Sequence, residues 1–403
     1  MNEFKTESGL TVLIERFPGT TTGIDLCTGF GSVFERENEA GIAHFLEHVF
    51  FSGSKLGRKK PFVLVEGKGG ELNAFTSKEE THFFSRIISS EIKAPLKVFS
   101  DCCNQGLFKE KDVELEKKII LNEIKESKDN PVRRVFNEFI ELSLPKPFNR
   151  PTIGFNKTVN SINPKKLRRA FEENYYSKNS MLGIATSLPE KKVLPLVDKL
   201  FKERKGKAQR KPAFKPAKKA EERKSFTKTE QAHCCLGFPA MNARHPDYFA
   251  FELISNYLGG GLSSRLVQEI REKRGLSYAI SANYSAEENH GLFTVYFSTN
   301  PLNITKTKKL IEIELERMQK KRLSGLDLRR AKKQLIGRNA LDLENSFNMA
   351  RALIERKKYG HGSLAEQEEK IKSLTIPGIQ RVAKEYLKPK NYFFSSLLPK
   401  KQD

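Results

Sequence analysis

The amino-acid sequence predicts an α+β protein with mainly antiparallel sheets, built as two similar domains. The chain has 403 residues, which is more than one hydrophobic core usually organises. Its predicted strands follow one another directly along the chain, and this favours antiparallel sheets over alternating βαβ units. A helix-turn-strand pattern also occurs twice, closing at Pro189 and again at Pro399, 210 positions later. Although chance similarity can produce such a pattern, a repeat of this size suggests duplication of one domain.

Hydrophobic periodicity places the elements in order along each half. The first half predicts strands at 9–17 and 22–31, a helix at 40–52, a bent strand or hairpin at 71–88, and helices at 91–106, 112–128 and 131–142. The second half predicts strands near 230–238, 276–286 and 291–299, and long helices near 303–322 and 326–357.

The segment 201–224 predicts the boundary between the two domains. It reads FKERKGKAQRKPAFKPAKKAEERK, with prolines, alanines and many like charges but few apolar residues, as in a linker or exposed loop. Contact with nucleic acid is the alternative, but the segment lacks interleaved aromatic residues for base stacking. We therefore expect domains at 1–200 and 225–403, joined by a basic linker.

Composition restricts the class of protein. The net charge of +23 suggests either a polyanionic partner or a lysine-rich solvated surface, and the lysines are spread along the chain outside the linker. No run approaches the roughly 18 apolar residues that a membrane span needs. The N-terminus lacks a signal pattern, and five cysteines, an odd number, fit free thiols in a reducing compartment. We expect a cytoplasmic protein without membrane or nucleic-acid partners.

The stretch GIAHFLEHVFFSG, residues 41–53, predicts a metal-binding helix. His44 and His48 are four positions apart, so on a helix both imidazoles lie on one face, one turn apart. Both rings could then reach one ion at about 2 Å, the usual zinc–nitrogen distance. Glu47 lies beside His48. An ordinary helix with two unrelated histidines is the alternative, about equally probable on this stretch alone.

A catalytic zinc needs a third protein ligand. The remaining histidines are scattered, at positions 82, 233, 245, 290 and 361, and the cysteines show no ligand spacing. The segment DVELEKKIILNEIKESKDNP predicts a helix on which Glu116 and Glu123 lie two turns apart on one face, about 10 Å along the axis. Either carboxylate could ligate while the other supports, and the spacing alone does not decide between them.

With these neighbours, H-F-L-E-H at 44–48 is the H-x-x-E-H signature of inverzincins. The chain resembles the pitrilysin-type zinc metallopeptidases, and is most similar in length and layout to bacterial relatives of mitochondrial processing peptidase. The resemblance rests on GSVFERENEAGIAHFLEHVFFSGS, GGELNAFTSKEETHFF, ELEKKIILNEIKE and LGGGLSSRLVQEIREKRGLSYAISA, which occur in that order over nearly the whole chain. It implies two similar α+β domains, each a mainly antiparallel sheet flanked by helices, with the metal motif only in the first.

The resemblance implies a zinc-dependent endopeptidase that cleaves unfolded or extended peptides. It assigns zinc to His44, His48 and Glu123, with Glu116 orienting a histidine, and it makes Glu47 the general base that activates the attacking water. Substrate contacts fall to four residues: Asn73 and Ala74 on an edge strand, and Arg271 and Tyr278 at the peptide and the developing oxyanion.

The resemblance also implies a dimer. Relatives of this length look like half of a clamshell, so we expect a homodimer or a heterodimer with a related subunit. Two rival functions remain: a non-catalytic scaffold of the same fold, and a basic nucleic-acid-binding protein suggested only by the net charge.

Overall fold

The structure is a computed structural model that describes residues 1–55, 60–206, 211–216, 220–320, 323–389 and 391–400. Contacts divide the chain into two compact units, each assembled from three separate stretches. The first unit comprises Met1–Lys125, Arg150–Pro212 and Leu341–Gly360. The second comprises Glu126–Asn149, Ala213–Ala340 and His361–Asp403. These units are defined by contacts between residues and do not follow continuous stretches of sequence. The domain limits predicted from the sequence, 1–200 and 225–403, therefore stay a prediction.

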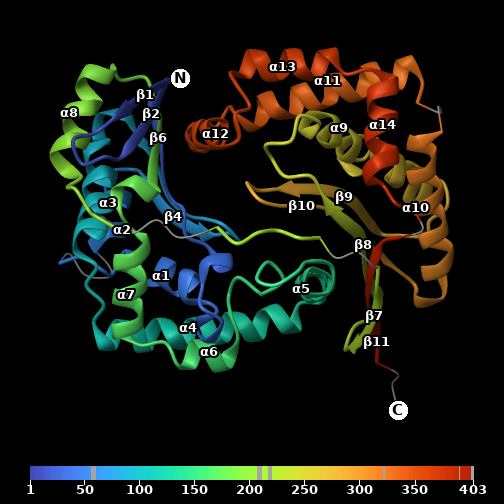
Figure 1. Cartoon of the computed structure of the whole chain (residues 1–403), viewed down its shortest axis with the longest axis horizontal. Helices are drawn as coiled ribbons and strands as arrows, with labels where there is room; N and C mark the ends of the chain where they lie inside the picture. Colours follow the sequence, from blue (N-terminus) through green and yellow to red (C-terminus); the bar gives the residue numbers. More distant parts are fainter. Residues whose placement is uncertain (56–59, 207–210, 217–219, 321–322, 390, 401–403) are drawn as a thin grey trace. The chain divides into compact units, whose positions relative to one another are not determined.

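The first unit is built on a six-stranded sheet with the order β1-β2-β6-β3-β5-β4 (Figure 1). Its strands are β1 (Asn2–Lys5), β2 (Thr11–Arg16), β3 (Thr21–Thr28), β4 (Glu71–Thr76), β5 (Thr81–Ile88) and β6 (Ser180–Thr186). β2 and β6 run parallel, and every other neighbouring pair runs antiparallel. The prediction of a mainly antiparallel sheet is confirmed here.

Helices cover both faces of this sheet. They are α1 (Ile42–Phe50), α2 (Lys60–Glu66), α3 (Lys93–Gln105), α4 (Glu110–Asp129), α6 (Asn156–Asn160), α7 (Pro164–Asn174), α8 (Glu190–Leu200) and α12 (Ser346–Tyr359). Successive residues of a strand point to opposite faces. Accordingly, Leu26 of β3 joins the large core that also contains residues of α1, whereas the adjacent Cys27 packs with Leu353 of α12. α1 and α12 therefore lie on opposite faces of one sheet.

The second unit has a five-stranded sheet with the order β7-β11-β8-β10-β9. Its strands are β7 (Glu222–Thr227), β8 (Ala232–Ala240), β9 (Ala279–Ala286), β10 (Gly291–Thr299) and β11 (Phe393–Pro399). Its helices are α5 (Pro131–Ser143), α9 (Tyr248–Gly259), α10 (Ile304–Gln319), α11 (Gly325–Asp342), α13 (Leu364–Ser373) and α14 (Ile376–Tyr386). No helix in the described part of the chain combines the length and the apolar content that a bilayer crossing requires.

The two sheets share one topology. In the first, β6 pairs parallel with β2 and antiparallel with β3; in the second, β11 pairs parallel with β7 and antiparallel with β8. The strand β6 follows helix α7, and β11 follows α14, which are the two copies of the pattern found in the sequence. The repeated pattern thus corresponds to a helix and a central strand in each unit.

One prediction of secondary structure was wrong in detail. The helix predicted at 326–357 is two helices, α11 and α12, because the Asn345 side chain accepts a hydrogen bond from the Phe347 N–H and begins a new helix. The linker predicted at 201–224 has no helix or strand at 201–206 and 211–216, but its last residues begin β7, and 207–210 and 217–219 lie outside the described residues. The strand β1 was not predicted.

Candidate metal centre

The local sequence determines where the helix α1 begins. Gly41 precedes it with a φ of 97°, and a Cβ at this position would lie 2.8 Å from the carbonyl oxygen of Ile153, so glycine fits both the conformation and the space. The buried carboxylate of Glu35 accepts hydrogen bonds from the N–H groups of Gly41 and Ala43, each at 2.9 Å. These N–H groups would otherwise lack partners at the helix N-terminus.

His44 and His48 project from one face of α1, as the spacing predicted, with ring centroids 4.6 Å apart. The opposite faces of α1 are apolar, and Phe45, Leu46 and Val49 are buried in the core. The two histidine side chains retain 12 % and 15 % of their exposure. A packed helix thus presents two imidazoles at the edge of the core.

The helix α4 brings both glutamates to these imidazoles. Its apolar side packs into the core through Val113, Ile120 and Ile124, and this orients the acidic positions towards α1. Glu123 lies 3.7 Å from Nε2 of His44 through one oxygen and 3.5 Å from Nε2 of His48 through the other. Glu116 lies 3.1 Å from Nδ1 of His48.

This geometry separates the roles that the spacing left open. One ligand atom each from His44, His48 and Glu123 lies within 4.8 Å of the others. Distances of 3.5 and 3.7 Å are long for hydrogen bonds, but two ligands of one tetrahedral zinc lie about 3.3 Å apart at normal bond lengths. The three residues therefore fit a zinc ion with little adjustment. Glu116 instead holds the outer nitrogen of His48, as the supporting carboxylates of metal sites do.

The charges favour a cation at the same point. Burial, together with the neighbouring His48, lowers the pKa of His44 to about 4, so this imidazole is neutral and has a lone pair to donate at neutral pH. Burial also acts to lower the pKa of His48, but the neighbouring carboxylates of Glu116 and Glu123 outweigh it and raise the pKa to about 9. The site thus attracts a proton to His48, where a metal ion would compete with it.

Glu47 lies on the same helix beside the ligands. Its Oε2 accepts a hydrogen bond from the hydroxyl of Thr76, the last residue of β4, at 2.6 Å. Burial raises the pKa of Glu47, although the Thr76 hydroxyl acts against this. A carboxylate with a raised pKa is a better proton acceptor at neutral pH than an ordinary glutamate.

Asn73 and Ala74 lie on β4, which is the last strand in the sheet order and pairs only with β5 among the described strands. The free edge of β4 could accept an extended peptide as an added strand. The side-chain oxygen of Asn73 accepts a hydrogen bond from the Ala74 N–H at 2.8 Å. A peptide that uses this N–H would have to displace the Asn73 side chain.

Arg271 and Tyr278 lie in the second unit. Arg271 belongs to a short π-helix, Val267–Glu272, and Tyr278, a residue that is 78 % exposed, precedes β9. The guanidinium carbon of Arg271 lies 5.8 Å from the ring centroid of Tyr278. The two residues are thus neighbours, and their action on a substrate stays a prediction.

The sequence reasoning did not assign a role to Thr76 or Glu35. Thr76 was visible as the last residue of GGELNAFT, but a hydroxyl that orients a distant carboxylate has no sequence spacing of its own. Glu35 lies six residues before the helix start that it caps. Such a distance falls outside the usual capping patterns.

Comparison with known proteins gives family matches for both halves. Residues 10–153 match the family model described as insulinase (peptidase family M16), and residues 161–335 match the model described as peptidase M16 inactive domain. A Rickettsia felis protein named as an uncharacterized zinc protease is 32 % identical over 83 % of this chain and 82 % of its own length. A Bacillus subtilis protein with the same type of name is 29 % identical, over 86 % and 85 %.

Among solved structures, a protease from Helicobacter pylori matches with a TM-score of 0.92 and 23 % identity, covering 99 % of both chains. At this identity the likeness concerns the fold. The match to an inactive domain falls on the half of the chain that lacks an H-x-x-E-H motif. His44, His48 and Glu123 all belong to the first unit.

Proposed function

The chain belongs to peptidase family M16, the insulinase family, and on this premise we propose that it is a zinc-dependent endopeptidase that hydrolyses peptide bonds in unfolded or extended peptides. The observation that carries this is the convergence of His44, His48 and Glu123 within 4.8 Å, next to Glu47. These three residues would hold the zinc. When bound, the ion would polarise the scissile carbonyl and lower the pKa of a water molecule towards 7.

Glu47 is the general base in this proposal. The Thr76 hydroxyl holds Oε2, which leaves Oε1 to take a proton from the attacking water as its oxygen bonds to the carbonyl carbon. Glu47 then gives that proton to the peptide nitrogen as the carbon–nitrogen bond breaks. A raised pKa suits both steps, because the same group must accept and then release one proton near neutral pH.

The substrate would bind as an extended strand along β4, with Asn73 and Ala74 beside its backbone. Hydrogen bonds to the main chain recognise an extended shape more than a sequence, so a broad preference for unfolded segments follows. Arg271 would contact the substrate, and Tyr278 would stabilise the oxyanion. We place the enzyme in the cytoplasm as a homodimer or a heterodimer with a related subunit; the five cysteines are all unpaired, which suits a reducing compartment.

The test is the Glu47→Gln variant, assayed with a quenched unstructured peptide and analysed for zinc. We expect unchanged zinc content and a loss of about 10²–10⁴ in rate, the usual contribution of a general base. Glu66→Gln, an exposed glutamate of the same unit, is the matched control and should cleave normally. Removing zinc with a chelator should abolish cleavage, and adding zinc should restore it. If Glu47→Gln cleaved as well as the wild type, or if the zinc-loaded wild type cleaved nothing, the proposed function would be wrong, and the second result would favour a scaffold.

A further inference from the structure

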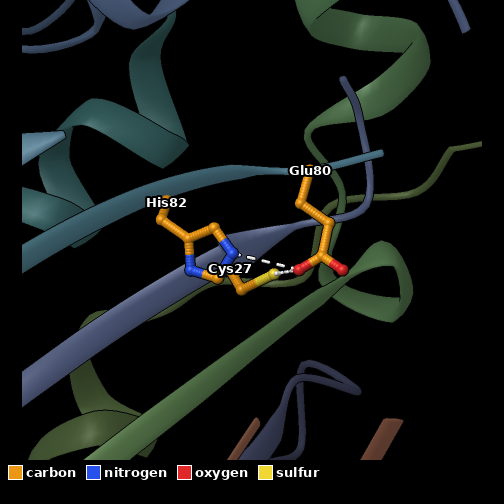
Figure 2. Close-up of side chains that lie close together, drawn as sticks. All are labelled: Cys27, Glu80 and His82. Atoms are coloured by element: carbon orange, nitrogen blue, oxygen red, sulfur yellow. Dashed lines mark hydrogen bonds and ion pairs between the residues drawn. The ribbon is translucent and has the colours of Figure 1, made fainter. Parts of the chain in front are cut away.

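A second group of metal-binding side chains lies buried in the first unit, away from α1. It consists of Cys27, Glu80 and His82, here called the Cys27 cluster, and each residue is no more than 5 % exposed. Their ligand atoms, Sγ, a carboxylate oxygen and a ring nitrogen, lie within 4.8 Å of one another (Figure 2). The sequence gives no ligand spacing here, because Cys27 is more than fifty positions from the other two.

The sheet brings the three residues together. Cys27 on β3 pairs directly with His82 on β5, and paired residues of antiparallel strands have side chains on the same face. Glu80 is two positions before His82, so it shares that face. This is the face covered by α12, since Cys27 packs with Leu353 and Ile354. Thr76 and Glu47, by contrast, belong to the α1 side.

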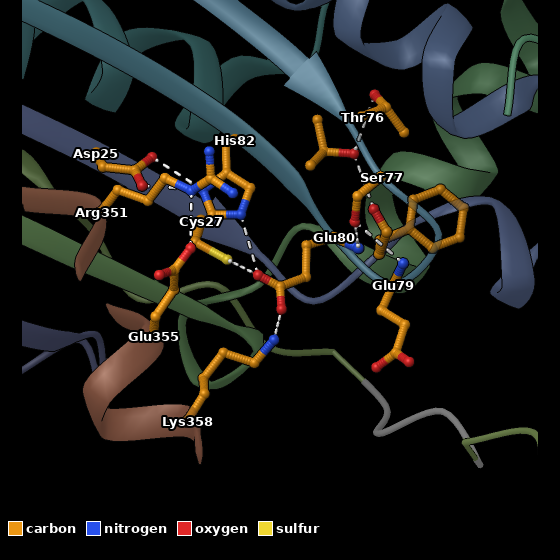
Figure 3. A network of polar contacts seen from close by, with 12 residues as sticks. Asp25, Cys27, Thr76, Ser77, Glu79, Glu80, His82, Arg351, Glu355 and Lys358 are labelled. Atoms are coloured by element: carbon orange, nitrogen blue, oxygen red, sulfur yellow. Dashed lines mark hydrogen bonds and ion pairs between the residues drawn. The ribbon is translucent and has the colours of Figure 1, made fainter. Parts of the chain in front are cut away.

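The contacts within the Cys27 cluster converge on one oxygen. Oε2 of Glu80 lies 3.1 Å from Sγ of Cys27 and 3.0 Å from Nε2 of His82. The other oxygen of Glu80 forms an ion pair with Lys358 of α12 (Figure 3). Zinc would hold such ligand atoms about 3.3–3.6 Å apart, so the cluster would open by about half an ångström to admit the ion.

The ring nitrogen of His82 that would not bind the ion, Nδ1, contacts a carboxylate, as in many metal-binding histidines. Asp25, two positions before Cys27 on β3, lies 2.9 Å from Nδ1 of His82 through Oδ2. A carboxylate on Nδ1 keeps the proton there and turns the lone pair of Nε2 towards the ion, which is the common arrangement behind zinc-binding histidines. The same relation links Glu116 to His48 at the candidate metal centre.

The fixed charges of this pocket suit a divalent cation. With an ion bound, a Cys27 thiolate and the carboxylates of Glu80 and Asp25 would carry three negative charges, which the divalent ion and the Lys358 ammonium would balance together. The nearby Arg351 and Glu355 pair with each other at 2.9 Å and cancel (Figure 3). A divalent ion would thus be compatible with the buried charges, because each charge would then have an opposite charge nearby.

We propose that Cys27, Glu80 and His82 bind a second divalent cation of the zinc class through Sγ, Oε2 and Nε2, with water as the fourth ligand. Thiolate and imidazole ligands favour zinc over calcium or magnesium. The site is buried and has no free strand edge for a substrate, so its role is structural. The ion would join β3 to the start of β5 and thereby stabilise the β4–β5 hairpin, whose other strand ends at Thr76, the partner of Glu47.

Metal stoichiometry tests the proposal without any activity measurement. The apoprotein is loaded with zinc, freed of excess metal and analysed for zinc per chain. We expect two equivalents in the wild type and one in the His44→Ala, His48→Ala double variant, which lacks the proposed catalytic site. One equivalent in the wild type and none in the double variant would overturn the second site.

Cobalt identifies the ligands. Of the two candidate metal sites among the described residues, only the Cys27 cluster contains a cysteine, so cobalt-loaded wild type and the double variant should both show thiolate-to-cobalt charge-transfer absorption in the near ultraviolet. Cys27→Ser should lose this absorption and one equivalent of metal, whereas the control Cys103→Ser should keep both. If Cys27→Ser fails to fold, the double variant alone decides, because it retains Cys27. Absence of the band from the double variant, or its persistence in folded Cys27→Ser, would contradict the assignment.

Discussion

At the scale of single residues, the candidate metal centre depends on polar contacts between side chains far apart in the sequence. Thr76 orients Glu47 from a neighbouring strand, and Glu116 orients His48 from a neighbouring helix. Each contact restrains a side chain, the carboxylate of Glu47 or the imidazole of His48, that would otherwise rotate more freely. Positioning of this kind accounts for a large part of catalytic rate and metal affinity.

Replacing Thr76 with valine removes the hydroxyl that donates to Glu47. We expect kcat to fall roughly tenfold, the scale of one hydrogen bond to a charged group. Because the Thr76 hydroxyl lowers the pKa of Glu47, its loss should also move the acidic limb of the kcat/KM profile to higher pH. Thr76→Ser keeps the hydroxyl and should preserve both kcat and the profile. Equal profiles for valine and serine would show that the contact does not matter.

Replacing Glu116 with glutamine keeps the shape of the side chain at His48 but removes its charge. We expect zinc affinity to fall about 10–100-fold, as in other sites that lose a supporting carboxylate. Competition with a chromophoric chelator measures this directly. Glu114→Gln, an exposed position of α4, should leave the affinity unchanged. An unchanged affinity in Glu116→Gln would mean that the 3.1 Å contact with His48 is incidental.

At the scale of elements, α1 begins beside the buried carboxyl group of Glu35. Glu35 accepts hydrogen bonds from two N–H groups there, and these hydrogen bonds act to lower its pKa. Burial outweighs them and raises the pKa of Glu35 from 4.5 to about 8. The folded protein therefore keeps a proton on Glu35 over a range in which the unfolded chain has lost it. Stability gained from this proton is complete below pH 4.5 and is lost as pH rises through 8.

The Glu35→Gln variant tests this linkage. The free energy of unfolding of the wild type, relative to the variant, should decrease between about pH 4.5 and 8, by at most about 1.4 kcal/mol per pH unit. Glutamine can still accept an N–H hydrogen bond but does not titrate. Denaturant unfolding of both proteins across this range gives the difference. A difference that is constant with pH would show that Glu35 titrates normally in the folded protein.

At the scale of the whole molecule, each compact unit uses a helix from a distant part of the chain. The sheet of the first unit uses residues from the first 186 positions, yet α12, at 346–359, covers one of its faces. In the second unit, α5, at 131–143, packs on β8 and β11. Neither sheet can bury both faces until nearly the whole chain is present. Contacts this far apart in sequence also slow folding.

Truncation of Leu353 tests how much α12 contributes to the first unit. This side chain is fully buried against Leu13 and Cys27. Leu353→Ala should cost about 2–5 kcal/mol, the range for buried leucines, and lower the midpoint of thermal unfolding followed by circular dichroism. Leu341→Ala, at a position that is 67 % exposed, should change stability by about 0.5 kcal/mol or less. Equal midpoints for the two variants would mean that α12 is not part of the folded unit.

Much of this architecture is encoded in short stretches of the sequence and could be predicted. Most strands, most helices and the repeat follow from periodicity, and the face shared by His44 and His48 follows from helical spacing. The break between α11 and α12 was missed because the periodicity continues across it. The break is marked by Asn345, whose side chain accepts a hydrogen bond from the Phe347 N–H and begins α12. His82 was set aside as unpatterned because its partner Cys27 is on another strand.

The sequence by itself determined the α+β class, the helix with two imidazoles and the pair of candidate glutamates. Only the tertiary structure decided that Glu123 faces both Nε2 atoms while Glu116 holds Nδ1, that Thr76 reaches Glu47, and that Cys27 meets His82. The physical reason is that spacing along one helix or strand sets directions within that element. Distances between elements depend instead on how their apolar faces pack, which no single stretch of residues encodes.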